Sequence, residues 1–136
     1  MLVSVILPVF NADQYIGIAI ESILSQSHKN FELIVINDGS TDNSIDIISK
    51  YEERDKRIIV INKDNSGIVD SLNLGISAAQ SNIIIRMDAD DIALSNRIAD
   101  LLAHQQKTQA SIVYSNISLI DKFGKHICDG FMPCEK

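Results

Sequence analysis

The sequence predicts an α/β fold in which a mostly parallel sheet of about five strands carries helices on both faces. Short apolar runs alternate along the chain with longer segments of helical period. The runs are apolar at successive positions, which is typical of strands buried on both faces of a sheet. Polar clusters follow these runs. Because the carboxyl ends of parallel strands share one edge, where ligands bind, we expect one polar rim.

Five runs are short, apolar and rich in β-branched residues, as buried strands are. They are residues 3–9, 31–36, 58–61, 83–87 and 111–114. The residues after Asp121 are weakly patterned and fit either a hairpin or a frayed end.

Four segments repeat apolar side chains at helical spacing. They are residues 13–26, 41–54, 68–80 and approximately 95–107. Asn11 and Asp13 are both candidates to cap the first of these helices, and Ser40-Thr41 can cap the second.

Length and composition indicate one globular domain. The chain has 136 residues, 46% of them hydrophobic, and a net charge of −6. A nucleic-acid partner is not expected, because such proteins need a basic footprint. Cys128 and Cys134 are expected to be reduced thiols, and with His126 they lack the fourth ligand of a zinc site. The apolar start has no basic region, and no stretch is long enough to span a membrane, so a soluble cytoplasmic domain is expected.

The acidic segment after the fourth predicted strand carries the strongest chemical signal. If strand geometry continues past Met87, Asp88 and Asp90 face the same side and Asp91 faces elsewhere. Adjacent carboxylates repel unless a cation lies between them, and hard oxygen ligands select Mg²⁺ or Mn²⁺. Mg²⁺ usually completes its shell with water and phosphate, which indicates a diphosphate ligand. The alternative is that these acids cap the next helix or are solvated.

The second predicted strand delivers Asp38 to the same rim. A carboxylate only accepts hydrogen bonds, so it suits a donor such as the N3–H of uracil or thymine. Gly39 permits a close backbone approach. The alternative is that Asp38 makes an Asx turn or caps the helix that follows.

Two weaker clusters complete the rim. Pro8 ends the pairing of the first strand, and Phe10 is placed either to contact a base or to pack in the core. The segment Asn65-Ser66-Gly67 can open a helix whose amides face an anion. Gly75 in mid-helix costs about 1 kcal/mol against alanine, which close packing or a helix break would explain.

In this order, LPVFN, FELIVINDGSTDNS, NSGIVDSLNLGISAA and RMDADD resemble the nucleotide-sugar-binding half of a family 2 glycosyltransferase with the GT-A fold. Each motif alone is weak, and the ordered set is specific. The resemblance covers residues 3–114. It departs at Leu72, where many relatives carry a basic residue, and this puts in doubt a positive contact to the donor from that helix.

The resemblance implies roles for the rim residues. The positions implied in binding the nucleotide-sugar are Pro8, Val9, Phe10, Asn11, Asp38, Asn65, Gly67, Asn73, Asp88 and Ala89. Asp38 would hold the base. Asp90 would coordinate Mn²⁺ or Mg²⁺ directly, with Asp88 as the second carboxylate, and Arg86 and Asp91 would support the site or the fold.

The implied activity is metal-dependent transfer of a sugar from a UDP-sugar or dTDP-sugar to a hydroxyl of a glycan or lipid-linked acceptor in cell-surface polysaccharide synthesis. In the family the general base lies downstream of the Asp-x-Asp strand, and no convincing base follows here. The resemblance therefore implies a single donor-binding domain, residues 1–136, from a longer enzyme, inactive alone. Membrane association at the inner face of the plasma membrane would come through the missing part.

Three further expectations remain. Apolar surface at Phe131-Met132 would favour a homodimer. The alternative function is a non-catalytic nucleotide-binding module of the same layout, although neither a GxGxxG nor a P-loop is present. A phosphatase that uses an aspartyl nucleophile is not expected, because the first strand ends in Pro-Val-Phe-Asn.

Overall fold

The computed structural model describes residues 1–130, and the chain falls into two compact units. The first is Met1–Ile98, and the second begins at Ala99. Each unit is described by itself. The expectation of a single domain from a longer enzyme stays a prediction.

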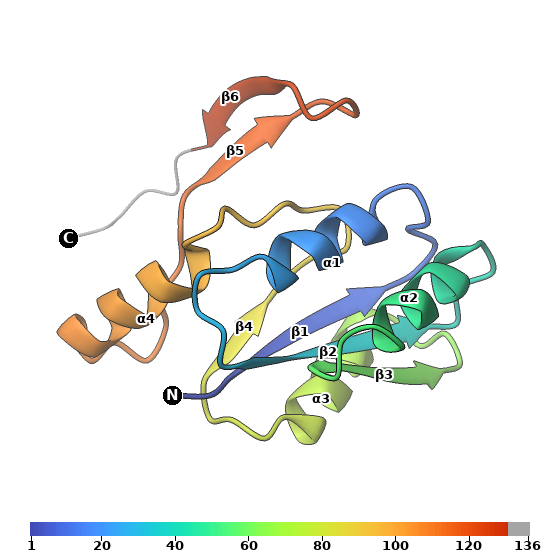
Figure 1. Ribbon diagram of the computed structural model, residues 1–136, viewed down its shortest axis with the longest axis horizontal. Helices are drawn as coiled ribbons and strands as arrows, with labels where there is room; N and C mark the ends of the chain where they lie inside the picture. Colours follow the sequence, from blue (N-terminus) through green and yellow to red (C-terminus); the bar gives the residue numbers. More distant parts are fainter. Residues whose placement is uncertain (131–136) are drawn as a thin grey trace. The chain divides into compact units, whose positions relative to one another are not determined.

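The first unit is built on a four-stranded parallel sheet with the order β3-β2-β1-β4 (Figure 1). The strands are β1 (Val3–Val9), β2 (Phe31–Asp38), β3 (Ile58–Lys63) and β4 (Ile84–Arg86). β1 is central and pairs in parallel with both β2 and β4. β2 is buried at every position, as its apolar run predicts. The predicted α/β fold class is confirmed.

The helices of this unit cover both faces of the sheet. They are α1 (Ile16–Leu24), α2 (Ser44–Glu52) and α3 (Ile68–Ala78). A fourth helix, α4 (Arg97–Thr108), begins at the end of this unit and continues into the second. The chain moves from β1 to β2 to β3 in one direction and then returns past them to β4. Right-handed crossovers therefore place α1 and α2 on one face and α3 on the other, as Figure 1 shows.

The core between the sheet and α3 is formed by side chains from alternate strand positions. Ile6, Ile34 and Ile36 are at most 1% exposed and form one cluster with apolar residues of α3. A Cβ built on Gly75 would lie 2.4 Å from Cγ2 of Ile6. Of the two explanations for a mid-helix glycine, close packing is therefore correct and a helix break is wrong, because α3 continues to Ala78.

The second unit contains an antiparallel hairpin, β5 (Ile117–Ile120) and β6 (His126–Gly130). The strand predicted at residues 111–114 is absent: the segment is irregular, and Ile112 is 82% exposed. That run of apolar residues finds no neighbouring strand to pair with. A hairpin was one of two structures expected after Asp121; the observed one begins earlier, at Ile117, and only its second strand follows Asp121. Phe131-Met132 and Cys134 lie outside the described residues.

Within residues 1–130, no helix combines the length and the apolar character needed to cross a lipid bilayer.

Candidate functional site

A cavity of about 560 Å³ opens at the carboxyl ends of β1, β2 and β4, beside the start of α3. It lies where the strand order reverses around β1, which is the usual ligand position in open α/β sheets. The residues that line it are Pro8, Val9, Phe10, Asn11, Ala12, Tyr15, Asp38, Asn65, Gly67, Ile68, Ser71, Arg86, Asp88, Ala89 and Asp90.

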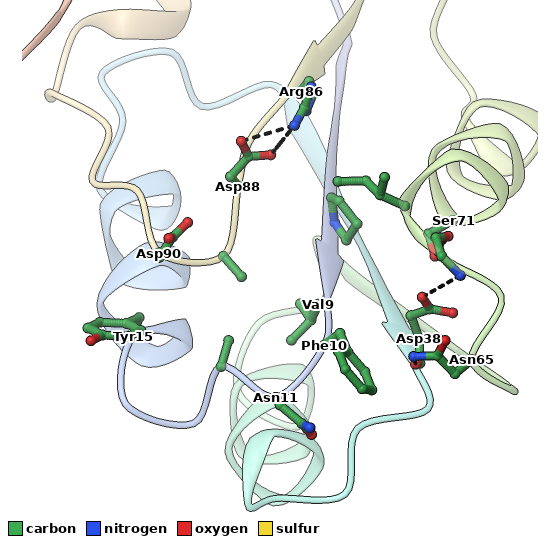
Figure 2. Close-up of a pocket in the computed structure, with 15 residues that line it drawn as sticks. Val9, Phe10, Asn11, Tyr15, Asp38, Asn65, Ser71, Arg86, Asp88 and Asp90 are labelled. Atoms are coloured by element: carbon green, nitrogen blue, oxygen red, sulfur yellow. Dashed lines mark hydrogen bonds and ion pairs between the residues drawn. The ribbon is translucent and has the colours of Figure 1, made fainter.

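The cavity gathers almost all of the residues predicted to bind ligand. Asn73 is the exception: its side chain is exposed on α3 and does not line the cavity. Phe10 is 52% exposed, so the core-packing alternative for this side chain is wrong. Figure 2 shows Asp38 on one side of the cavity and Asp88 and Asp90 on the other.

Sequence reasoning missed part of the lining. The helical spacing of Ile68 and Ser71 at the start of α3 could have indicated them, since residues three apart share a helix face. Ala12 and Tyr15 carried no comparable signal. Arg86 was expected only in a supporting role, but it lines the cavity itself.

Asp38 is almost buried, at 4% exposed, and its carboxylate accepts three hydrogen bonds from the protein. Oδ1 accepts hydrogen bonds from Lys63 Nζ and from the Ser66 amide at 2.9 Å. Oδ2 accepts one from the Gly67 amide at 2.9 Å. Burial by itself would raise the pKa of Asp38, but these donors outweigh it and lower the pKa below the ordinary value. Asp38 is therefore an ionised acceptor, and Oδ2 keeps room for one more donor.

These contacts revise two expectations about the loops. The Asx turn after β2 is made by Asn37, whose Oδ1 accepts from the Ser40 amide at 3.1 Å, and not by Asp38. The amides before α3 do face an anion, as predicted, and within the protein that anion is Asp38 itself. Asp38 thus joins the end of β2 to the start of α3.

The loops after β1 and β2 are tied to each other. Asn11 has a φ of 49°, its Oδ1 accepts from the Thr41 amide at 2.8 Å, and its amide donates to Ser40 Oγ at 3.1 Å. Asn11 and Ser40-Thr41 therefore link two loops, and the prediction that they cap helices is wrong. At Gly39, with a φ of 70°, a Cβ would lie 2.8 Å from the amide nitrogen of Asn65. This close approach requires glycine.

The acidic segment is a turn and not a strand extension. β4 ends at Arg86, and the Asp91 amide donates to the Asp88 carbonyl at 3.2 Å. Asp88 and Asp90 still line the cavity together while Asp91 does not, so the predicted placement is right for a different reason. Burial raises the pKa of Asp91, and the negative charges of Asp88 and Asp90 add to that rise. The turn therefore concentrates negative charge.

Of the two carboxylates of the turn that line the cavity, Asp88 is paired with a cationic side chain and Asp90 is not. Arg86 donates to Asp88 through Nε to Oδ1 at 3.0 Å and through a terminal nitrogen to Oδ2 at 3.1 Å. Asp90 makes no hydrogen bond or ion pair with any residue in the range 1–130. None of these carboxylates accepts from an amide of α4 in that range, so the capping alternative is wrong.

Two buried polar side chains, one in α1 and one just after its end, anchor the segment that follows the turn. Gln26, at 0% exposed, donates to the Leu94 carbonyl at 2.7 Å and accepts from the Ile98 amide at 3.0 Å. Ser22 Oγ accepts from the Ala93 amide at 3.0 Å. These contacts hold the chain downstream of Asp90 against α1.

The residues present fit a hard divalent cation. The described part of the chain contains no group of three potential metal-ligating side chains. Asp88 and Asp90 nevertheless offer two carboxylates from one turn, and Mg²⁺ or Mn²⁺ takes one or two carboxylates and fills its shell with water and phosphate oxygens.

Comparisons with known proteins agree with this arrangement. The family model described as "Glycosyl transferase family 2" matches residues 4–127. An uncharacterized glycosyltransferase of Haemophilus influenzae is 45% identical over 107 residues, which cover 78% of this chain and 33% of that protein. Glycosyltransferase GlyG of Streptococcus pneumoniae is 37% identical over 116 residues, 85% of this chain and 38% of that protein. The chain thus spans about a third of the length of these curated relatives.

Solved structures share the fold. Residues 1–349 of S. aureus TarS, solved in complex with UDP, give a TM-score of 0.72 at 27% identity, over 80% of this chain and 33% of that one. The mannosyltransferase PcManGT of Pyrobaculum calidifontis, solved with GDP-Man and Mn²⁺, gives 0.68 at 24% identity, over 87% and 35%. Together with the family match over residues 4–127, these likenesses show that the chain belongs to glycosyl transferase family 2 and has the GT-A fold.

Proposed function

We propose that this chain binds the nucleoside-diphosphate part of a UDP-sugar or dTDP-sugar with the help of Mn²⁺ or Mg²⁺, and that it forms the donor-binding portion of an enzyme that transfers the sugar to an acceptor hydroxyl. The observation that carries the proposal is that one cavity has Asp38 on one side and Asp88 and Asp90 on the other. The UDP complex of TarS supports uridine as the nucleoside.

Asp38 and Phe10 form the base end of the site. The Oδ2 atom of Asp38 has one acceptor position left after the Gly67 amide, and this position suits the N3–H of uracil or thymine. Adenine has no donor at the equivalent ring nitrogen. Phe10, half exposed beside it, offers a face on which the base stacks.

Asp88 and Asp90 form the diphosphate end. These residues would hold the cation, which when bound neutralises the charge that grows on the leaving diphosphate. The protein's own part is to fix two carboxylates on a short turn whose downstream segment is anchored by Gln26. Asn65 and Gly67 hold the loop beside the nucleotide.

The chain by itself is proposed to bind the donor without completing transfer. Transfer needs a general base near the acceptor hydroxyl. The one unpaired carboxylate of the lining, Asp90, is assigned to the cation. The acceptor, a glycan or a lipid-linked sugar, remains part of the proposal for the longer enzyme, as does a role in cell-surface polysaccharide synthesis.

Isothermal titration of the 136-residue chain with UDP, with and without Mn²⁺, tests the proposal. We expect Mn²⁺ to tighten UDP binding about tenfold or more, and ADP to bind much more weakly. Asp90→Asn should remove the gain from Mn²⁺. Asp46→Asn, which makes the same charge change at an exposed position of α2, should leave it intact. Equal UDP affinity with and without metal, or a preference for ADP, contradicts the proposal.

A further inference from the structure

We propose that Arg86 is an exchangeable counter-ion. It holds Asp88 while no divalent cation is bound, and it turns to the diphosphate once a cation has taken that carboxylate. This inference rests on the proposed function and adds to it a specific task for a residue outside the acidic pair.

The first step is that Arg86 and a cation compete for the same atoms. The guanidinium engages both oxygens of Asp88, at 3.0 Å and 3.1 Å. The guanidinium occupies the lone pair of each oxygen that faces it, and its positive charge repels a cation from the same carboxylate. Cation binding at Asp88 therefore opposes this ion pair and favours the release of Arg86.

The second step is that Arg86 can leave at little cost. Its side chain is 56% exposed and that of Asp88 is 41% exposed. Ion pairs that are open to water to this extent contribute little to stability, because solvent screens them and replaces their hydrogen bonds. A divalent cation, drawn by both Asp88 and the unpaired Asp90, outcompetes one such pair.

The third step is that the backbone stays in place while the side chain moves. Arg97 donates to the Arg86 carbonyl at 3.3 Å and contacts Met87 Sδ at 3.9 Å. The Met87 amide also donates a hydrogen bond to the Ile6 carbonyl of β1 at 3.0 Å. The Arg86 side chain is thus the mobile part of a fixed strand end.

The fourth step is that the released guanidinium has one obvious ligand. Among the lining residues, all within the described part of the chain, Arg86 is the only one with a positively charged side chain. Lys63 is engaged with Asp38 at the other end of the site. A guanidinium binds phosphate oxygens with the same fork that it uses for a carboxylate, so a diphosphate replaces Asp88 without loss of geometry.

The net charge of this end of the cavity sets the order in which the cation and the diphosphate bind. Two carboxylates and one guanidinium leave this end of the cavity negative, which repels a diphosphate. A bound divalent cation makes the net charge of this end positive. Diphosphate binding then follows the cation, and Arg86 becomes its second positive partner.

Titrations of the Arg86→Gln variant with Mg²⁺ alone, and with UDP at saturating Mg²⁺, test this. Without its competitor, Mg²⁺ should bind Arg86→Gln roughly 2–5 times more tightly than the parent chain, the range expected for removal of an exposed ion pair. UDP should bind about tenfold more weakly, and uridine equally well, because only the phosphate contact is lost.

A control and a direct observation separate exchange from a general change in charge. Arg57→Gln removes a similar fork to a carboxylate two residues away, Asp55, outside the cavity, and should change neither affinity. In ¹⁵N-labelled chain, the Nε–H resonance of Arg86, assigned by its loss in Arg86→Lys, should shift on addition of Mg²⁺ and again with UDP.

The outcomes are distinct. If Arg86→Gln weakens Mg²⁺ binding, or leaves UDP binding unchanged, or if Mg²⁺ does not move the Arg86 resonance, the exchange is wrong while the proposed function stands. If the parent chain binds UDP without any dependence on the metal, the proposed function fails and the exchange fails with it.

Discussion

Gly75 and Ile6 are in closer contact than any other residue at position 75 would permit. The missing side chain of Gly75 lets α3 lie directly against β1, at a distance where a Cβ would come within 2.4 Å of Ile6 Cγ2. Ile6 is 1% exposed and is β-branched, so it has no space to move into. The same strand continues to Pro8, and Phe10 follows its end in the cavity, so this contact also sets where α3 begins beside the site.

Gly75→Ala should lower the free energy of unfolding by about 1–2 kcal/mol, because overpacking of the core outweighs the better helix propensity of alanine. Urea denaturation measures this. Gly17→Ala is the matched control: its Cβ would meet nothing closer than 3.5 Å, and stability should stay equal or rise. Equal effects of the two substitutions would show that the contact with Ile6 is unimportant.

Lys63→Met should make the fold more sensitive to acid. A carboxyl group whose pKa is lower in the folded state stabilises the fold above its unfolded pKa of about 3.9, and this stability is lost as pH falls through the folded pKa. Burial would raise the pKa of Asp38, and Lys63 is the largest of the influences that lower it. Without Lys63, the acid-unfolding midpoint should move to higher pH, and stability near neutral pH should fall by about 1–3 kcal/mol.

Acid titration followed by circular dichroism measures this shift. Lys56→Met removes the same charge from an exposed side chain that forms no ion pair within residues 1–130, and should leave the midpoint unchanged. A midpoint that moves to lower pH in Lys63→Met contradicts the assignment.

Phe10→Ala should weaken UDP binding about tenfold and leave the melting temperature unchanged. Stacking of a base on an aromatic ring contributes about 1–3 kcal/mol, whereas a side chain that is 52% exposed contributes little to the core. Calorimetry and thermal melting measure the two effects separately. Phe123→Ala, at an 83% exposed position of the hairpin, is the control. A loss of stability without a loss of UDP affinity would mean that Phe10 packs in the core and does not stack on the base.

Gln26→Leu should destabilise the fold by about 2–4 kcal/mol and loosen the segment after the acidic turn. The substitution leaves the buried Ile98 amide without the acceptor that Gln26 provides, and the Leu94 carbonyl keeps only its hydrogen bond from the Arg97 amide. Hydrogen exchange at Ile98 should rise more than exchange in β2. Gln80→Leu, at an exposed position, should leave both unchanged. A uniform rise across the sheet in Gln26→Leu would mean that the residue has no local anchoring role.

The two central strands of the sheet were predictable because almost every one of their residues is buried. In β2 all eight positions are buried, and residues 33–36 form the continuous apolar run that is typical of a strand covered on both faces. The segment around Ile112 has the same local composition, yet it is exposed and irregular. Local composition cannot show whether a neighbouring strand is available, and this is a property of the whole fold.

The position of the site was predictable from the sequence, but the contacts among its residues were not. Strand order brings Asp38, Asp88 and Phe10 to one rim, and this follows from topology alone. The donors to Asp38 come from Lys63 and from the loop before α3, and they depend on loop conformations that include a φ of 94° at Gly67. The Asp88–Arg86 pair was missed because it depends on a turn that begins directly after β4, where strand spacing no longer applies.

The position of β4 also has a consequence for how the molecule folds. β1, β2 and β3 pair with neighbours that follow one another along the chain, whereas Ile84 must return past both other strands to reach Ser4. Contacts between residues so distant in sequence form slowly, because a long loop must be closed first. An intermediate that lacks β4 would already have Asp38 in place but not Asp88 and Asp90. A nucleotide ligand would therefore not speed the folding steps before β4 docks, and it would stabilise the folded chain only after that step.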